Sequence, residues 1–371
     1  MLSLILALVL CQDQIDKWVA DLDADSVELR AEAVKQLRAL DGSMAQRLHA
    51  IKVTSLEAKT RLDEIIVVLD RKARVSGLTK SYPTVTAEYK DVPIQTIIED
   101  LKKFGLEFTG TLDAKKVTMT FKNAPMMEVL DCLAKASNTQ WQWHNTGVIW
   151  YQNTILAGGP AVYSSGFRVR LRAVGADRIS NFASKTQITR AWVDLVAEPK
   201  IEYVSPQVHF DSPTEAFVMA SQNIVPCTKQ WGLDMGQPMV LTSDKFMNKL
   251  SLSGKARVLF QTSPTKLSVK PKETLKHGKY ELSIGSDESH HITITGASHD
   301  WLAEHVDNIM VVDSSGVQYG ATINNIYYPD ETTCKIYVCS QTYDMKEIRL
   351  TFYDEVLEHF IPFEFKDVEL P

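Results

Sequence analysis

The densest group of residues able to do chemistry lies in the C-terminal third of the chain, where four histidines and four carboxylates occur within 19 residues. They are Asp287, Glu288, His290, His291, His299, Asp300, Glu304 and His305. Zn²⁺ and related divalent ions take imidazole and carboxylate ligands in proteins. The spacing argues against a metal site, since adjacent His290 and His291 face opposite ways on a strand. His299 and His305 are six residues apart and point to different sides of a helix. We therefore expect a solvated hairpin and loop, without a metal or another cofactor.

A row of three arginines is the second candidate site. Arg168, Arg170 and Arg172 occupy every second position of an expected strand, so all three cations share one face. Such a row could recognise phosphate or an anionic polymer. The alternative, which we favour, is ordinary pairing with carboxylates on a neighbouring strand. Those carboxylates are Asp194, Glu198 and Glu202.

Aromatic residues are the third source of candidate sites. Trp141 and Trp143 share one strand face, where they could stack on a sugar or grip a peptide; we favour packing in a core or between domains. Trp231 lies in a polar stretch and is a better candidate for an exposed binding residue, as are Tyr327 and Tyr328.

Motifs of the common enzyme classes do not occur in the sequence. The chain has no Walker loop, no glycine-rich dinucleotide turn, no HExxH, no GxSxG and no paired CxxC. This absence lowers the case for catalysis without excluding it.

The elements that position these residues are organised around a repeat within residues 85–151. The first copy reads VTAEYKDVPI and the second reads VTMTFKNAPM, and equivalent residues are 32 apart. Each copy alternates like a strand, and then apolar residues recur at helical spacing. Asp91 and Asn123 are expected N-caps, with Pro93 and Pro125 in the first helical turn. Two β-α-β units therefore make one small α+β domain over residues 84–152.

This pattern of strand, Asx-x-Pro-apolar turn, helix and strand resembles the short N-terminal domain shared by secretins and TonB-dependent transducers. The resemblance implies a periplasmic module that contacts proteins and is not catalytic. No transmembrane barrel or secretin ring domain follows it here, so a transport role does not carry over. The whole arrangement, including the C-terminal stretch 362–371, is similar to uncharacterised exported proteins of planctomycete-like bacteria.

The flanking segments are predicted to be a helical domain and two β-domains. Residues 12–75 read as four short helices that resemble a pair of HEAT-type repeats. They could offer a concave face to a partner, although we favour a bundle that covers the next domain. Residues 166–262 and 263–371 read as short strands without intervening helices, which is typical of antiparallel immunoglobulin-like sandwiches.

The first residues of the chain indicate export. Residues 2–10 form an apolar run, too short to span a bilayer, which needs roughly 20 residues. The run fits a signal peptide over residues 1–11, with Val9 and Cys11 before cleavage and Gln12 as the mature start. No Lys or Arg precedes it, and a buried first helix or a lipoprotein acylated at Cys11 are the alternatives. We expect a protein of the periplasm or cell envelope.

The cysteines do not require a disulfide framework in a chain of this length. There are five. Cys334 and Cys339 are expected on opposite faces of one strand, and Cys132 in a core. A bond from Cys227 to Cys334 or to Cys339 stays open.

Composition narrows the function. The chain has 371 residues, a net charge of −6 and no basic stretch that would favour nucleic acid. We predict a non-enzymatic envelope protein that binds or scaffolds envelope proteins or a surface polymer. An exposed edge strand of the duplicated domain is the expected contact. The alternative is a carbohydrate-active or metal-dependent hydrolase, or a carbohydrate-binding module, on the sandwich domains. A deep cleft with converging His and carboxylates would favour the hydrolase, and a flat aromatic strip the binding module.

Overall fold

The computed structural model describes most of the chain and shows a mixed α and β protein. The described residues are 14–79, 83–110, 115–144, 147–151, 159–164, 166–180, 184–198, 201, 204–211, 217–219, 224–226, 238–285, 291–296, 302–340 and 344–371. About 27% of them are helical and about 53% lie in strands, in several antiparallel sheets. Within this part of the chain, no helix is both long and apolar enough to cross a membrane.

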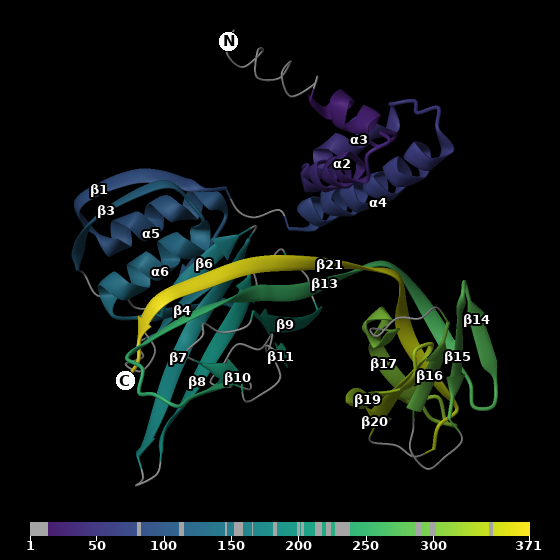
Figure 1. Ribbon diagram of the computed structural model, residues 1–371. Coiled ribbons are helices and arrows are strands. Elements are labelled where there is room, and N and C mark those ends of the chain that lie inside the picture. Colours follow the sequence, from purple (N-terminus) through teal and green to yellow (C-terminus); the bar gives the residue numbers. More distant parts are fainter. Residues whose placement is uncertain are drawn as a thin grey trace.

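Helices form the N-terminal unit (Figure 1), and the longest of those described, α4, has 23 residues. They are residues 14–21, α2 (Val27–Ala39), the 3-10 turn η1 (Gly42–Met44), α3 (Ala45–His49) and α4 (Leu56–Leu78). Ser26 and Ser55 begin α2 and α4, because the hydroxyl of each accepts a hydrogen bond from a backbone N–H three residues on. Gly42 lets η1 approach α4 closely, since a Cβ on it would lie 2.2 Å from the backbone nitrogen of Ala73.

The core of this unit lies along one stripe of each helix. Its fully buried members are Ile15, Leu22, Leu37, Leu48, Ala58, Ile65 and Leu69. The expected domain end at residue 75 falls inside α4. The helix continues because Val75 is buried against the core of the first β-lobe instead of entering a linker.

The duplicated stretch forms a compact α+β unit. Its first copy comprises β1 (Val85–Pro93), α5 (Ile94–Leu101), η2 (Lys102–Phe104) and β2 (Glu107–Thr109). Its second copy comprises β3 (Lys116–Ala124), α6 (Met126–Ser137) and β4 (Gln140–His144), followed by β5 (Gly147–Tyr151). β1 pairs with β3, and β5 lies between β2 and β4.

Both copies have the same element order, and a near two-fold arrangement relates them. The β1–β3 register pairs Val85 with Ala124 and Val92 with Val117, and a 32-residue exchange maps one pair onto the other. Two hydrogen bonds are related by the same 32-residue exchange. The backbone N–H of Asp91 donates to Thr118 Oγ1, and that of Asn123 donates to Thr86 Oγ1. The internal repeat is therefore present in the structure.

The helix starts in this unit differ from the expectation. Asp91 and Asn123 do not cap the helices; they adopt left-handed backbone conformations, with φ of 52° and 51°, at the ends of β1 and β3. Pro93 and Pro125 occupy the N-cap position instead, without a side-chain hydrogen bond. Asn and Asp tolerate the left-handed region better than other side chains, which explains why an Asx residue is used there.

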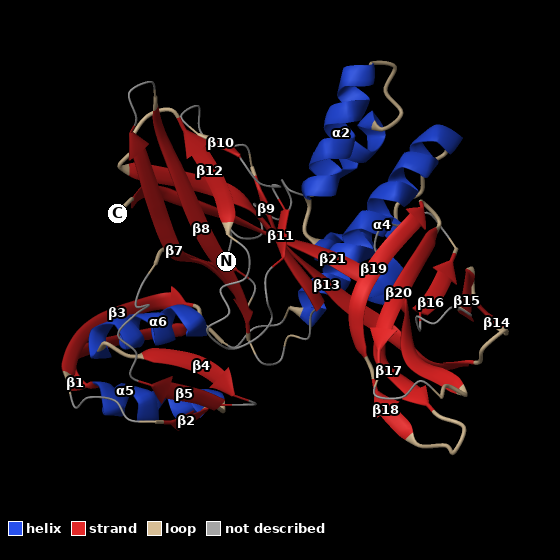
Figure 2. Cartoon of the chain, turned by 90° about the horizontal axis from the view of Figure 1, so that it is seen from below, coloured by secondary structure: helices blue, strands red, loops and turns tan. Residues whose placement is uncertain are grey.

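Three antiparallel sheets build the rest of the chain (Figure 2). The first sheet has the order β10-β12-β8-β7-β6, with β6 (Ala161–Ser164), β7 (Phe167–Ser180), β8 (Lys185–Ala197), β10 (Val218–Met219) and β12 (Met239–Ser243). The shared sheet has the order β11-β9-β13-β21-β17-β18, with β9 (Val204–Phe210), β11 (Ile224–Pro226), β13 (Lys249–Val269), β17 (Val306–Val312), β18 (Gln318–Gly320) and β21 (Glu347–Glu369). The third sheet has the order β14-β15-β16-β20-β19, with β14 (Thr274–His277), β15 (Tyr280–Ile284), β16 (His291–Thr295), β19 (Thr322–Asp330) and β20 (Thr333–Cys339). A 3-10 turn, η3 (Leu302–His305), precedes β17.

A long ribbon of β13 and β21 joins two β-lobes, as Figure 1 shows in green and yellow. Residues of the first sheet share a core with one half of this ribbon, around Phe167, Phe260 and Phe365. Residues of the third sheet share a core with the other half, around Ile294 and Phe352. The cores change over near residue 262 on β13, where the sequence predicts a boundary.

The expected domain over residues 263–371 is nevertheless wrong at its C-terminal end. Residues Leu357–Leu370 pack in the core of the first lobe, because β21 pairs with β13 along its whole length and returns there.

An ion pair fastens the helical unit to the ribbon at the crossover. Both terminal nitrogens of Arg74 in α4 contact the carboxylate of Glu355 in β21, and Arg74 Nη1 lies 2.6 Å from Glu355 Oε1. Glu355 faces Thr262 across the ribbon and accepts a hydrogen bond from its hydroxyl. This ion pair lies where the core of the first β-lobe ends and the core of the second begins.

Candidate functional site

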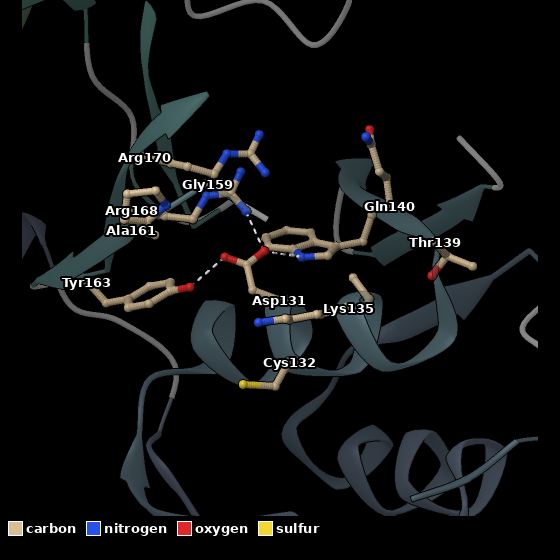
Figure 3. A pocket seen from close by; sticks show the side chains of 13 residues that line it. Asp131, Cys132, Lys135, Thr139, Gln140, Gly159, Ala161, Tyr163, Arg168 and Arg170 are labelled. Carbon is tan, nitrogen blue, oxygen red and sulfur yellow. Dashed lines mark hydrogen bonds and ion pairs between the residues drawn. The ribbon is translucent and has the colours of Figure 1, made fainter. Parts of the chain in front are cut away.

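A cavity of about 300 Å³ lies where the duplicated domain meets the first sheet (Figure 3). We call it the junction pocket. Its walls are the C-terminal half of α6, the start of β4, residues 159–161, β6 and the start of β7. The lining residues are Asp131, Cys132, Ala134, Lys135, Thr139, Gln140, Trp141, Gly159, Pro160, Ala161, Tyr163, Arg168 and Arg170.

Asp131 is the central side chain of the pocket, and three donors from three elements hold it. Trp141 Nε1 in β4 and Arg168 Nη1 in β7 each donate to Asp131 Oδ1 at 2.7 Å. Tyr163 in β6 donates its hydroxyl to Asp131 Oδ2 at 2.6 Å. Figure 3 shows the carboxylate between these groups. Since both oxygens are engaged, Asp131 joins two domains and is not free to act as a base.

Arg168 is the most buried cation of the pocket. Its side chain is 5% exposed, and its guanidinium lies over the Trp141 ring at 4.9 Å from the ring centroid. Its Nε makes no hydrogen bond with any described residue. The phenol of Tyr163 is also affected by this environment: burial and the nearby Asp131 charge raise its pKa, so it remains a donor.

Arg170 takes the partner that the sequence predicts. It lies opposite Asp194 in the β7–β8 register, and Arg170 Nη2 donates to Asp194 Oδ2 at 2.6 Å. Burial lowers the pKa of Arg170, but the Asp194 carboxylate more than compensates and the pKa is raised overall. Cross-strand pairing is therefore confirmed for Arg170.

The arginine row is not a single exposed face. Arg168 is buried and reaches across to Asp131 of the duplicated domain, a partner that the sequence analysis missed. Arg172 is half-buried and does not line the pocket, and the β7–β8 register shifts at this point, between Leu171 and Ala173. Glu198 is buried, and Glu202 lies outside the described residues.

Gly159 allows the pocket wall to form. A Cβ on Gly159 would lie 1.8 Å from the backbone oxygen of Leu171, so only glycine fits this close approach to β7. The backbone N–H of Leu171 donates to the oxygen of Pro160 at 3.0 Å. Residues 159–161 are thereby held against the strand that carries Arg168 and Arg170.

Two polar side chains of the pocket have no ion-pair or hydrogen-bond partner in the described part of the chain. Gln140 Nε2 is buried without an acceptor. Lys135 is exposed on α6 and makes none of the ion pairs found among the described residues. Cys132 lines the same wall; burial and the charges of Glu128 and Asp131 raise its pKa, so the thiol is a poor nucleophile.

The tryptophans of β4 are buried, as expected for packing residues. Trp141 and Trp143 contact each other edge to face at 5.2 Å between ring centroids, and both belong to the core of the duplicated domain. Trp141 also reaches the first sheet through Asp131 and Arg168, which makes it an inter-domain residue. Of the other aromatic candidates, Trp231 lies outside the described residues. Tyr327 and Tyr328 lie on β19 and are 54% and 38% exposed.

The histidine-rich segment does not converge on one point in the described residues. No group of three or more His, Cys, Asp or Glu side chains there could hold a metal ion. His291 is buried beside Tyr337, and His305 is buried beside Tyr280 and Phe352. Glu304 is half-buried, and the other members, Asp287, Glu288, His290, His299 and Asp300, lie outside the described residues.

The described cysteines carry free thiols. Cys334 is fully buried and Cys339 is exposed, and neither forms a disulfide. Cys227, for which the sequence left a bond to either thiol open, lies outside the described residues.

Comparisons with protein-family models, with curated proteins and with solved structures find no match to this chain.

Proposed function

We propose that this protein is a non-enzymatic, exported protein of the cell envelope. Its domains form a scaffold that binds a protein partner. The observation that carries the proposal is strand β19. It lies at the edge of the third sheet, and all nine of its residues are exposed. Four of them are large and apolar, namely Ile323, Ile326, Tyr327 and Tyr328.

An exposed, apolar edge strand is a surface that natural proteins usually protect unless it binds another chain. β20 pairs with one edge of β19, and the pairing has irregularities after Ile323 and after Tyr327. Among the described strands, no other one pairs with β19. The pairing with β20 is regular over residues 325–327. A partner chain would bury Ile326 and Tyr327 there, and aromatic residues are enriched at such interfaces.

The proposed contact therefore lies outside the duplicated domain, whose sheet edges leave less strand exposed for a partner chain. β2 has three residues, and β4 carries Gln140 and Trp141 at the junction pocket. β1 and β3 are as long as β19, with nine residues each, but both have buried positions, whereas every residue of β19 is exposed. Adjacent Tyr327 and Tyr328 point to opposite faces of a strand, so they do not form the flat strip that a sugar would need.

The state of the pocket residues supports binding over catalysis. Asp131 accepts three hydrogen bonds, Arg170 is paired with Asp194, and burial keeps the Cys132 thiol protonated. None of the three is free to act as a base or nucleophile.

The finer architecture belongs to the same proposal. The helical unit is a HEAT-like pair that covers its neighbours, which the contact of Arg74 with Glu355 supports. The duplicated unit is a relative of the short N-terminal domain of secretins and TonB-dependent transducers. The two lobes are immunoglobulin-like sandwiches that share the β13–β21 ribbon, as their entirely antiparallel pairing supports.

The partner surface can be tested by capture from native envelope fractions. Tagged wild-type protein, an Ile326→Ser/Tyr327→Ala variant and an Ile179→Ser control are compared. Ile179 is 50% exposed on β7, so the control removes a similarly exposed apolar residue from another lobe. A partner retained by wild type and the control but lost by the β19 variant is expected. Equal capture by all three proteins would refute the assignment of β19.

Export can be tested separately by N-terminal sequencing of protein from native cells. The expected first residue is Gln12. An intact Met1 in the cytosolic fraction would contradict export and leave the assignment of β19 standing.

A further inference from the structure

Among the edge strands of the described sheets, β19 is long and carries almost no charge. Its nine residues read TINNIYYPD, and of these only the terminal Asp330 is charged. β1 and β3 are equally long, but β1 carries three charged residues and β3 carries two. The other described edge strands have at most five residues. Natural edge strands are usually protected by charges or by short length, so this uncharged edge indicates a strand that pairs with another chain.

An incoming strand can pair with the outer side of β19. The backbone N–H of Ile326 donates to the side chain of its neighbour, Asn325 Oδ1, at 2.9 Å. Such a local acceptor is an alternative to a strand ladder, so a carbonyl of an incoming strand can replace it without loss of a hydrogen bond. Ile326 and Tyr327 are 40% and 54% exposed, so pairing there also removes apolar surface from water.

The charge pattern of β19 fits a second copy of the same strand in antiparallel orientation. Strand addition needs a partner with an equally open edge, and a second copy supplies one of the same length. When Ile326 of one copy faces Ile326 of the other, Asp330 of each strand lies opposite Thr322 of its partner. The two carboxylates are then roughly eight residues, or about 27 Å, apart along the sheet. This distance exceeds the Debye length of about 8 Å at physiological ionic strength, whereas parallel pairing would place the carboxylates side by side.

We propose that the protein forms a two-fold symmetric dimer in which β19 pairs antiparallel with β19 of a second copy, with the axis at Ile326. The inference rests on the proposed function, because it names the partner that β19 binds. The third sheets of the two copies become one continuous sheet. Each copy uses the same edge, so the assembly closes at two chains. Tyr327 of each strand faces Asn325 of the other, and such cross-strand pairs stabilise a sheet.

Sedimentation of the full chain tests the dimer directly. Wild type is expected to be dimeric at about 100 μM, because an interface built around one strand is small and of modest affinity. Each copy has a net charge of −6, so an ionic strength of about 0.15 M is used to screen the repulsion. Ile326→Lys should make the chain monomeric, because two like charges then face each other across the axis. Ile179→Lys is the matched control: Ile179 is 50% exposed on β7, and the dimer should persist.

Cysteine cross-linking tests the register. Cys339 is an exposed native thiol, so the cysteine variants also carry Cys339→Ser, and Cys339→Ser alone gives the background. Ile326→Cys should form an intermolecular disulfide with copper–phenanthroline as oxidant. Residues that face each other in an antiparallel pair have Cα atoms about 4.5–5.5 Å apart, within reach of a disulfide. Ile323→Cys is the control on the same strand: Ile323 is 44% exposed. Its two copies would lie roughly 20 Å apart along the sheet and should not react.

The outcomes either support or overturn the proposal. A wild-type dimer that is lost in Ile326→Lys, and that is cross-linked through Ile326→Cys but not through Ile323→Cys, supports it. A monomer at about 100 μM overturns it, as does a dimer that Ile326→Lys leaves unchanged. Absence of a disulfide in Ile326→Cys, or equal cross-linking of the two cysteine variants, also overturns it. A monomer that still captures an envelope protein through β19 refutes the second copy and leaves the proposed function standing. If capture is independent of β19 as well, both fail.

Discussion

Replacing Asp131 by asparagine should destabilise the joint between the duplicated domain and the first sheet. The substitution keeps the shape of the side chain but removes the charge that compensates Arg168, whose side chain is 5% exposed. The new amide also presents N–H groups to a site that already holds three donors. Breaking a buried ion pair by removing one partner costs about 3–5 kcal/mol. Since Asp131 itself is 22% exposed, the lower end, about 3 kcal/mol, is expected.

Urea unfolding followed by tryptophan fluorescence measures the effect, because Trp141 donates directly to the altered group. A double-mutant cycle with Arg168→Met isolates the pair. Arg168→Met alone should be destabilising, since it leaves the Asp131 charge with two donors instead of three. The double variant should be more stable than the sum of the single changes predicts, with a coupling free energy of about 2 kcal/mol.

The matched control is the exposed Asp177–Arg190 pair between β7 and β8. Its side chains are 59% and 40% exposed, so Asp177→Asn should change stability by about 1 kcal/mol or less. If Asp131→Asn changed stability no more than Asp177→Asn, or if the cycle showed no coupling, the account of Asp131 as the link between two domains would be wrong.

Three further results are expected. Leu130 is fully buried in α6, so Leu130→Ala should reduce the free energy of unfolding of the duplicated domain by about 2–5 kcal/mol in urea titrations; a loss below about 1 kcal/mol would contradict its place in the core. Burial lowers the pKa of His359, so the unfolded chain binds more protons than the folded one below the unfolded pKa of about 6.5. Stability should therefore fall as the pH drops from about 7 toward the folded pKa, and His359→Phe should flatten this slope in thermal melts; an unchanged slope would argue against the assignment. Burial raises the pKa of Cys334 to about 12, so iodoacetamide at pH 8 should label Cys339 and spare Cys334 in the native protein, as peptide mapping by mass spectrometry would show. Equal labelling of both thiols would contradict the burial of Cys334.

In the duplicated domain, the pattern of consecutive residues predicts some structural features and misses others. The 32-residue offset predicts its strand–helix order, because alternation and helical spacing are properties of consecutive residues. It does not predict the helix starts correctly. An Asx residue before a proline satisfies both an N-cap and a left-handed turn, and the pairing of β1 with β3 selects the turn. Thr86 and Thr118, which repeat at the same offset, accept the hydrogen bonds of the Asx backbones and were the signal available.

The sequence predicts only some of the ion pairs of the junction pocket. Arg168 and Arg170 are identified by their alternation, and Asp194 by its position on the next strand. Asp131 looks like an ordinary surface residue of an amphipathic helix. It lies 37 residues before Arg168, and only docking of α6 onto β6 and β7 brings the two within 2.7 Å. No pattern of consecutive residues encodes that contact.

The sequence by itself determined the class of each segment: helices first, a duplicated α+β unit next, and strands to the end. These follow from periodicity and turn residues, which act over a few positions. Only the tertiary structure decided that β13 and β21 form one ribbon shared by both lobes, pairing Arg257 with Phe360 and Leu267 with Leu350. Strand pairing between residues about a hundred positions apart depends on which apolar faces bury each other. That choice is made by the whole chain at once, and so are the lobe boundary, the pocket and the exposed edge of β19.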